Sequence, residues 1–120
     1  MKPKIDSTEF GQVTIEGNRY EHDVIIRLDG QVKKRKKKLS KKIYGTSHII
    51  SLEEAEYIYQ EGMERLIIGT GQTGLVKLSD QAAGYFKANK CPVDLRPTPE
   101  AIAVWNEARG AVVALLHVTC

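Results

Sequence analysis

The stretch SLEEAEYIYQEGMERLIIGTG, residues 51–71, decides the fold class of this chain. Ser51 and Glu54 form the pattern of a capping box, which marks the beginning of a helix. Apolar residues then recur at helical spacing until Gly62, where we expect the helix to end. The run Leu66-Ile67-Ile68 lies in a predicted strand at Arg65–Gly69, and such a run is typical of a strand buried on both faces. A helix that leads into a strand of this kind indicates an α/β protein.

The same alternation continues toward the end of the sequence. Ser79 can cap a second helix, roughly residues 80–89, and a short strand is predicted at Pro92–Leu95. The last apolar run, Ala111–Val118, is predicted to be another buried strand.

A third helix is predicted between these two strands. Thr98 is expected to cap it, with Pro99 at its first position and Gly110 just past its end. Strands that alternate with helices favour right-handed crossovers and a largely parallel sheet covered on both faces.

The first third of the chain is predicted to be β-rich. Short apolar runs are separated by Gly11 and by the turn at Gly17-Asn18, and Asp29-Gly30 offers a hairpin turn. We expect strands within Ile5–Phe10, Gln12–Glu16, Arg19–Leu28 and Gln31–Leu39. They should form hairpins that pack against one side or edge of the α/β core.

Length and composition are those of one globular domain, with 120 residues of which 42% are hydrophobic and 28% charged. We expect residues 1–120 to form this domain, with a β-rich part at 1–44 and an alternating α/β core at 45–120. The longest apolar stretch, Ala111–Leu116, is too short to span a membrane. No secretory signal is recognised, and Cys91 and Cys120 make no disulfide framework. These features predict reduced thiols and a cytoplasmic location.

Positive charge is concentrated in one segment. Eight basic residues and no acidic ones lie between Gln31 and Tyr44, whereas the other 10 basic residues stand against 15 acidic ones. The eight are Lys33, Lys34, Arg35, Lys36, Lys37, Lys38, Lys41 and Lys42. We favour a solvated strand edge that resists aggregation, because like charges cannot be buried together. Binding of nucleic acid or of an acidic partner is the alternative, and only Tyr44 offers a ring for base stacking.

Residues 69–74 match the pattern G-x-G-x-x-G after a predicted strand. The residues are Gly69, Thr70, Gly71, Gln72, Thr73 and Gly74. Such a loop can cradle a pyrophosphate at a helix N-terminus. Here Leu75–Leu78 separates the loop from the next helix, and Asp94 lies within a very short strand. We favour a tight exit from the strand whose glycines permit positive φ, with a nucleotide or small ligand as the alternative.

The three histidines, His22, His48 and His117, are too scattered to predict a metal site, and no cofactor is indicated. A catalytic Cys/His pair requires the fold to bring His48 next to Cys120. We favour packed or hydrogen-bonded histidines, although His48 and His117 are kept as candidate ligand-binding residues.

Four segments together resemble a known family. They are Tyr44-Gly45-Thr46-Ser47-His48, the helix from Ser51, the run from Leu66 to Gly71, and the ending Leu116-His117-Val118-Thr119-Cys120. The chain resembles one small uncharacterised family that includes archaeal and bacterial conserved proteins, the human adipogenesis-associated domain protein and a mitochondrial complex I assembly factor. The resemblance implies a three-layer α/β fold whose central mixed, mostly parallel sheet has one antiparallel strand. It implies no activity.

Three functional hypotheses follow. The leading one is a non-enzymatic binding or assembly protein, with an unknown protein partner or small ligand and a small cleft at Gly69–Gly74. The second is an enzyme or ligand-binding protein that holds a phosphorylated or nucleotide ligand at this loop. The third is nucleic-acid binding through Lys33–Lys42.

Overall fold

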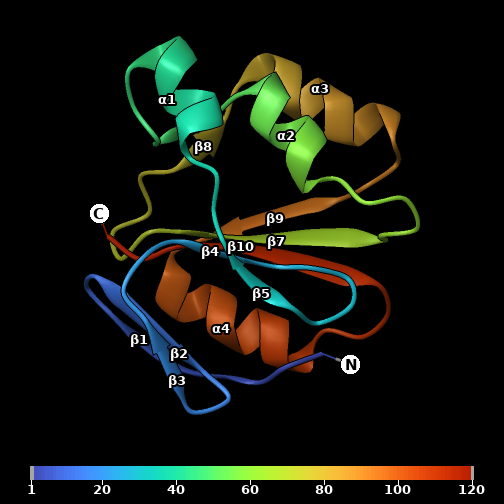
Figure 1. Ribbon diagram of the computed structural model, residues 1–120. Helices are drawn as coiled ribbons and strands as arrows, with labels where there is room; N and C mark the ends of the chain where they lie inside the picture. Colours follow the sequence, from blue (N-terminus) through green and yellow to red (C-terminus); the bar gives the residue numbers. More distant parts are fainter. Residues whose placement is uncertain (1, 120) are drawn as a thin grey trace.

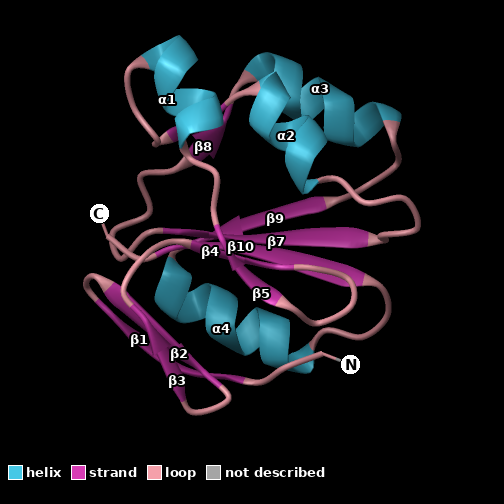
Figure 2. Ribbon diagram, in the orientation of Figure 1, coloured by secondary structure: helices cyan, strands magenta, loops and turns pink. Residues whose placement is uncertain are grey.

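The computed structural model describes residues 2–119. Ten strands and four helices lie within these residues, as labelled in Figures 1 and 2. In chain order they are β1 (Ile5–Glu9), β2 (Gln12–Ile15), β3 (Asn18–Tyr20), β4 (Val24–Ile26), β5 (Val32–Lys34), α1 (Lys38–Tyr44), β6 (Ile49–Ile50), α2 (Leu52–Ile58), β7 (Arg65–Thr70), β8 (Lys77–Leu78), α3 (Asp80–Ala88), β9 (Val93–Arg96), α4 (Thr98–Glu107) and β10 (Val112–His117).

The central sheet has five strands in the order β5-β4-β10-β7-β9. Strands β10, β7 and β9 are mutually parallel, β4 is antiparallel to β10, and β5 is antiparallel to β4. Only β4 therefore runs against the other four strands, which confirms the mixed, mostly parallel sheet that the resemblance implied. Strands β4 and β5 come from the first third of the chain, so this part contributes to the central sheet as well as to the outlying hairpins.

Helices cover both faces of the central sheet. Figure 1 shows α1, α2 and α3 on one side and α4 on the other. The three-stranded antiparallel sheet β1-β2-β3 lies on the far side of α4, which is thus enclosed between two sheets. This confirms the predicted N-terminal hairpins packed against an α/β core. None of the helices within residues 2–119 is long and apolar enough to cross a membrane.

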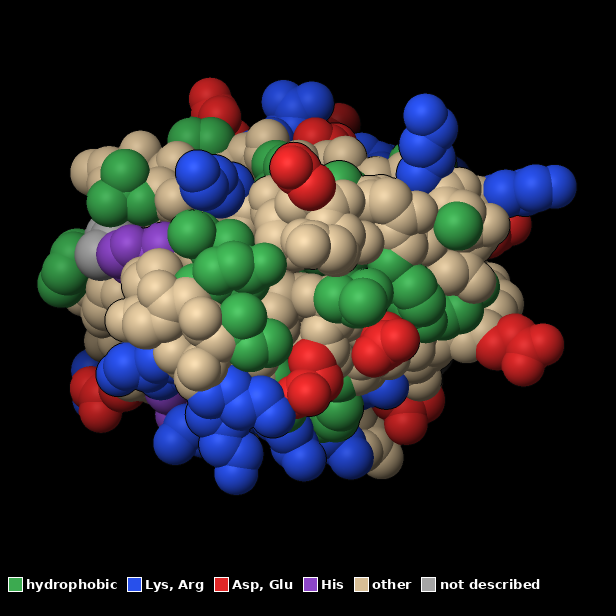
Figure 3. All heavy atoms as spheres, turned by 90° about the horizontal axis from the view of Figure 1, so that it is seen from above, with side chains coloured by type: hydrophobic (Ala, Val, Ile, Leu, Met, Phe, Trp, Pro, Cys, Tyr) green, Lys and Arg blue, Asp and Glu red, His purple; other side chains and the backbone are tan. Residues whose placement is uncertain are grey.

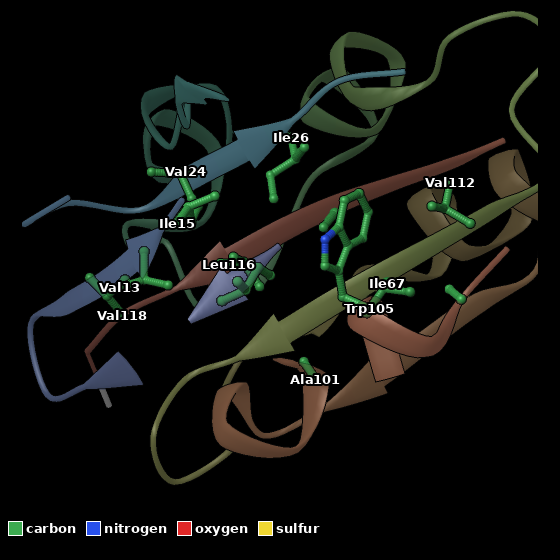
Figure 4. Close-up of a cluster of buried hydrophobic side chains, with 13 residues drawn as sticks. Val13, Ile15, Val24, Ile26, Ile67, Ala101, Trp105, Val112, Leu116 and Val118 are labelled. Carbon is green, nitrogen blue, oxygen red and sulfur yellow. The ribbon is translucent and has the colours of Figure 1, made fainter. Parts of the chain in front are cut away.

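The side chains of β10 explain why the central sheet is buried on both faces. Ala114 and Leu116 face α4 and belong to one apolar cluster, whereas Val113 and Leu115 face α2 and α3 and belong to another. This alternation follows from the period of two in a strand. On the α4 side Trp105 fills the centre of the cluster (Figure 4), and its indole N–H donates to the Pro3 carbonyl at 2.8 Å.

The first third of the chain departs from the predicted strands at two points. The strand expected over Arg19–Leu28 is divided into β3 and β4, with Asp23 in the break. The return strand expected over Gln31–Leu39 ends at Lys34, and α1 begins at Lys38. Asp23 and Arg35 face each other at these two points, where the Arg35 amide bonds to the Asp23 carbonyl at 3.0 Å and both side chains are buried.

The predicted helix caps at Ser51 and Ser79 are confirmed, because these hydroxyls accept hydrogen bonds from the amides of Glu54 and Ala82. The predicted end of α2 at Gly62 is wrong, because the helix ends at Ile58.

The predicted cap of α4 at Thr98 is also wrong. Pro97 occupies the N-cap position and no side chain caps this helix. The Thr98 hydroxyl instead donates to the His117 carbonyl at 2.6 Å and accepts from the Gly71 amide at 2.9 Å. It therefore joins the ends of β10 and β7 to the beginning of α4.

Candidate functional site

A buried cluster of charged side chains lies beside the carboxyl end of β10. Its first member is Asp23, which precedes β4. One oxygen of Asp23 accepts hydrogen bonds from His117 Nδ1 at 2.7 Å and from Arg35 at 2.9 Å, and the other accepts from the Val118 amide at 2.9 Å. Asp23 thus joins β4 and the segment after β5 to the end of β10.

Arg35 is the centre of the cluster and corrects the predicted basic patch. Its side chain is buried rather than solvated. The guanidinium makes two hydrogen bonds to Glu54, at 2.7 and 3.0 Å, and a further one of 2.9 Å to the Ser47 carbonyl. Two carboxylates surround this cation, so its burial is compensated, whereas a lysine could not form the same paired contact. Arg35 is therefore a structural residue inside a run of surface lysines.

Glu54 differs from the partner expected in a capping box. Its carboxylate does not return to the Ser51 amide but binds Arg35 and accepts from the Ser40 hydroxyl. The Ser51 amide donates to Ser40 Oγ at 2.9 Å, and the Ser51 hydroxyl donates to the Leu39 carbonyl at 2.9 Å. These bonds tie α1 to the beginning of α2. They complete a buried network of ionisable side chains, Asp23, Arg35, Glu54 and His117, called here the Arg35 network.

Charge is maintained within the Arg35 network despite burial. Burial alone would raise the pKa of Asp23, but the hydrogen bonds from His117 and Val118 and the charges of His117 and Arg35 hold this pKa below its ordinary value. Burial alone would lower the pKa of Arg35, and hydrogen bonds to Glu54 and Asp23 and the charges of these carboxylates raise it instead. The buried state thus contains an aspartate anion and an arginine cation.

The histidines meet at this edge of the sheet. The rings of His48 and His117 pack edge to face with centroids 5.3 Å apart, and Thr119 Oγ1 lies 3.2 Å from His117 Nε2. Asp23, His117 and Thr119 thus stand in the order acid, imidazole and hydroxyl that is also found in catalytic triads. Cys120 lies outside the described residues, so the disfavoured alternative of a His48–Cys120 pair also lies outside them.

Two features distinguish this arrangement from a working triad. Asp23 is shared with Arg35, which reduces its effect on the imidazole. The nearby amides of Gly71, Gln72 and Val118 already donate to Thr98, Thr119 and Asp23, so they form no oxyanion hole. The geometry is that of a hydrogen-bonded strand end.

The glycine-rich loop lies against the same edge. Thr70 is the register partner of His117, and the Gln72 amide bonds to the Thr119 carbonyl at 3.0 Å. Gly71 and Gly74 have φ values of 109° and 79°, as expected for a tight exit from a strand. Gly69 is required for a different reason, because a Cβ there would lie 2.8 Å from Thr98 Oγ1.

The surroundings of the loop differ from a dinucleotide site. The amides of Gly71, Gln72 and Gly74 are used in bonds to Thr98, Thr119 and Gly71 itself, so they do not present a phosphate cradle. Strand β8 pairs with β6 directly after the loop, and α3 begins only at Asp80. Within residues 2–119 no group of three or more His, Cys, Asp or Glu side chains is placed to hold a metal ion.

Comparison with known proteins shows the family to which this chain belongs. The family model described as "Protein of unknown function (DUF498/DUF598)" matches residues 5–117. The chain belongs to this family. A search of curated proteins found no match.

Solved structures of relatives share the whole fold. The conserved hypothetical protein PH1505 from Pyrococcus horikoshii OT3 is 34% identical with a TM-score of 0.88, and 98% of this chain and 99% of that chain are covered. The protein MT938 is 35% identical with a TM-score of 0.83, over 99% and 100% of the two chains. A Bordetella parapertussis protein has the same fold at 16% identity, with a TM-score of 0.78 and coverage of 98% and 96%. The family has no known function, so the comparisons assign none to the site.

In this DUF498/DUF598 protein, the surface lysines form a separate feature. Residues Lys34–Lys38 line a groove of about 390 Å³, called here the lysine groove. Figure 3 shows Lys and Arg side chains gathered along one border of the face that carries α1 to α3. Lys36 lies over the Tyr57 ring, and Lys42 pairs with Glu53. No carboxylate within residues 2–119 pairs with the remaining lysines of this segment, which are Lys33, Lys34, Lys37, Lys38 and Lys41.

Proposed function

We propose that this protein is a non-enzymatic binding or assembly protein that contacts an acidic partner protein through the lysine groove. The observation that carries the proposal is the separation of charge around Arg35. Arg35 is neutralised inside the protein, whereas the lysines on either side of it are exposed and lack carboxylate partners among the described residues. Unneutralised cations on one border favour association with an anionic surface.

The arrangement of the catalytic-type residues supports a non-enzymatic role. Asp23, Glu54 and His117 are buried and hydrogen-bonded to one another or to Arg35. Their hydrogen bonds and ion pairs join β4, β10, α1 and α2.

An acidic protein fits the lysine groove better than a nucleic acid. The adjacent end of α1 exposes Ile43 and Tyr44, whose relative exposures are 53% and 37%. An aliphatic side chain beside lysines suits a partner with both acidic and apolar groups, whereas single-stranded nucleic acids require several aromatic rings for stacking. We further propose a cytoplasmic location, which the buried free thiol of Cys91 supports.

The test compares a poly-glutamate peptide with single-stranded RNA and duplex DNA, titrated into the labelled protein at rising salt. A variant with Lys34, Lys37, Lys38 and Lys41 replaced by Gln should lose at least about tenfold in affinity for poly-glutamate. The matched control, Lys4→Gln with Lys77→Gln, removes exposed lysines that lie outside the lysine groove and should bind as the wild type does. The proposal would be overturned if the protein bound RNA or DNA more tightly than poly-glutamate. It would also be overturned if the variant with four lysines replaced still bound poly-glutamate as the wild type does.

A phosphorylated ligand at Gly69–Gly74 is the competing function and is tested separately. Native mass spectrometry of the purified protein with added ATP and NAD detects such a complex. Binding at sub-millimolar concentration together with amide shifts at residues 69–74 would favour this function over the binding protein.

A further inference from the structure

A second groove lies between α3 and β9, at the other border of the central sheet. It measures about 450 Å³, and its lining includes Ala83, Phe86, Lys87, Cys91, Val93 and Leu95. Phe86 and Cys91 are buried and form an apolar floor, whereas Leu95 is 43% exposed. This feature is called here the β9 groove.

Strand β9 is an edge strand with an open side. It pairs with β7 on one side and is the last strand in the sheet order. The bond from the Leu66 amide to the Pro92 carbonyl sets the phase of the parallel ladder, so Asp94 and Arg96 direct their backbone groups toward β7. Val93 and Leu95 therefore direct theirs outward, and no hydrogen bond within residues 2–119 satisfies these outward groups.

The side chains of β9 place apolar groups toward the groove and charged groups away from it. Val93 and Leu95 line the groove. Asp94, on the opposite face, pairs with Arg65 and Arg96 at 2.8 Å each. A strand added beside β9 would therefore direct every second side chain into an apolar groove.

The charges around the groove indicate what kind of strand fits. Lys87 and Lys90 line the groove, and neither pairs with a carboxylate of the described residues. Lys90 also has a φ of 55°, a left-handed conformation that favours glycine. In β9-to-β9 pairing of two copies, these lysines would approach the same lysines of the other copy, and like charges oppose this. An acidic side chain among those that the added strand directs into the groove would neutralise them.

We propose that the β9 edge and its groove bind an extended segment of a partner protein as an added strand of the central sheet. Every second residue of this segment faces the groove, and these residues are apolar with at least one acidic residue among them. Backbone hydrogen bonds to Val93 and Leu95 would supply affinity, and the groove and its two lysines would select the sequence. This surface is distinct from the lysine groove, which lies at the β5 side.

The experiment uses the full chain and the acetylated peptide Glu-Ser-Val-Ser-Val-Ser-Glu, whose glutamate and valine side chains lie on one face when the peptide is extended. Amide NMR shifts should change at Val93 and Leu95, and slow hydrogen exchange should appear at these amides when the peptide is bound. Leu95→Lys introduces an edge lysine and should weaken binding by at least about tenfold. Lys87→Glu with Lys90→Glu alters only exposed side chains and should weaken it as strongly, with circular dichroism used to verify folding.

The control variant, Lys34→Glu with Lys37→Glu, alters the lysine groove and should leave the β9 shifts unchanged. Shifts confined to residues 33–42 would show binding at the lysine groove alone and would overturn the proposal. The absence of any amide NMR shift at millimolar peptide would also overturn the proposal. A dimer in light scattering that Leu95→Lys converts to monomer would identify a second copy as the occupant and would also overturn it.

Discussion

The two edges of the central sheet differ in how they meet solvent. Strand β5 carries Lys33 and Lys34, and exposed lysines on an edge oppose pairing with another strand. Strand β9 carries no lysine and presents Val93 and Leu95 beside an apolar groove. The lysines of β5 thus oppose the pairing of another strand at one edge of the sheet. The other edge, at β9, lies beside an apolar groove that suits an added strand.

The ion pairs at the two edges also differ in how deeply their side chains are buried. Beside β5, the side chains of Arg35 and Glu54 are each 1% exposed. In β9, the side chain of Asp94 is 22% exposed and those of its partners Arg65 and Arg96 are 36% and 48% exposed. Because solvent screens exposed pairs, only the Arg35 network should be energetically important.

Replacing Arg35 should have the largest effect. Arg35→Met leaves Asp23 and Glu54 buried without their cation and should lower the free energy of unfolding by about 3–5 kcal/mol. Asp94→Asn should lower it by at most about 1 kcal/mol, because its partners are solvated. Urea denaturation at neutral pH measures both. Lys33→Met is the control within β5 and should change stability by less than about 0.5 kcal/mol. Equal losses of unfolding free energy for Arg35→Met and Asp94→Asn would contradict the inference that the more deeply buried ion pairs contribute more to stability.

Acid should destabilise the protein at the β5 side of the sheet by protonating Asp23. The folded pKa of Asp23 is lowered, so its stabilising contribution is present above the unfolded pKa of about 3.9 and is lost as the pH falls toward the folded pKa. The stability difference between wild type and Asp23→Asn should therefore be full at pH 6 and narrow below about pH 4. Urea denaturation from pH 6 to pH 3 tests this, and a constant difference over that range would count against it.

Replacing Lys90 should have the smallest effect and the opposite sign. Lys90→Gly relieves a left-handed backbone conformation at the end of α3 and should raise stability by about 0.5–1 kcal/mol. It also removes one cation from the β9 groove, so binding of the peptide with groove-facing valines and glutamates should weaken. Thermal unfolding and peptide titration on one preparation measure both quantities. A destabilised variant would show that the lysine side chain contributes to packing.

The regular elements around the core could be predicted because their signals are local. The apolar runs at Leu66–Ile68 and Ala111–Val118 identified the strands buried on both faces, and serine caps identified the beginnings of α2 and α3. Helix α1 was missed, because its first two residues were assigned to the edge strand that was predicted to end at Leu39 and no element was expected over residues 40–44.

The Arg35 network was missed for a different reason. Asp23 lies inside the strand predicted over Arg19–Leu28. Arg35 and Glu54 each had a satisfactory local explanation, as a surface cation and as a capping-box glutamate. One signal was present, because Arg35 is the single arginine among the lysines of residues 31–44 and a guanidinium is the better partner for carboxylates. His48 and His117 were named as candidates, but their contact depends on pairing of segments far apart in sequence.

The sequence alone determined the alternation of helices and strands, the apolar faces that require a covered sheet, and the concentration of lysine after residue 32. These follow from side-chain chemistry and from periods of 2 and 3.6 residues. Only the tertiary structure decided which charges are buried and which edge is open. Burial of Arg35 depends on Asp23 and Glu54 reaching it from other segments, and the open edge depends on β9 being last in the sheet. Both are consequences of long-range pairing, which no local pattern specifies.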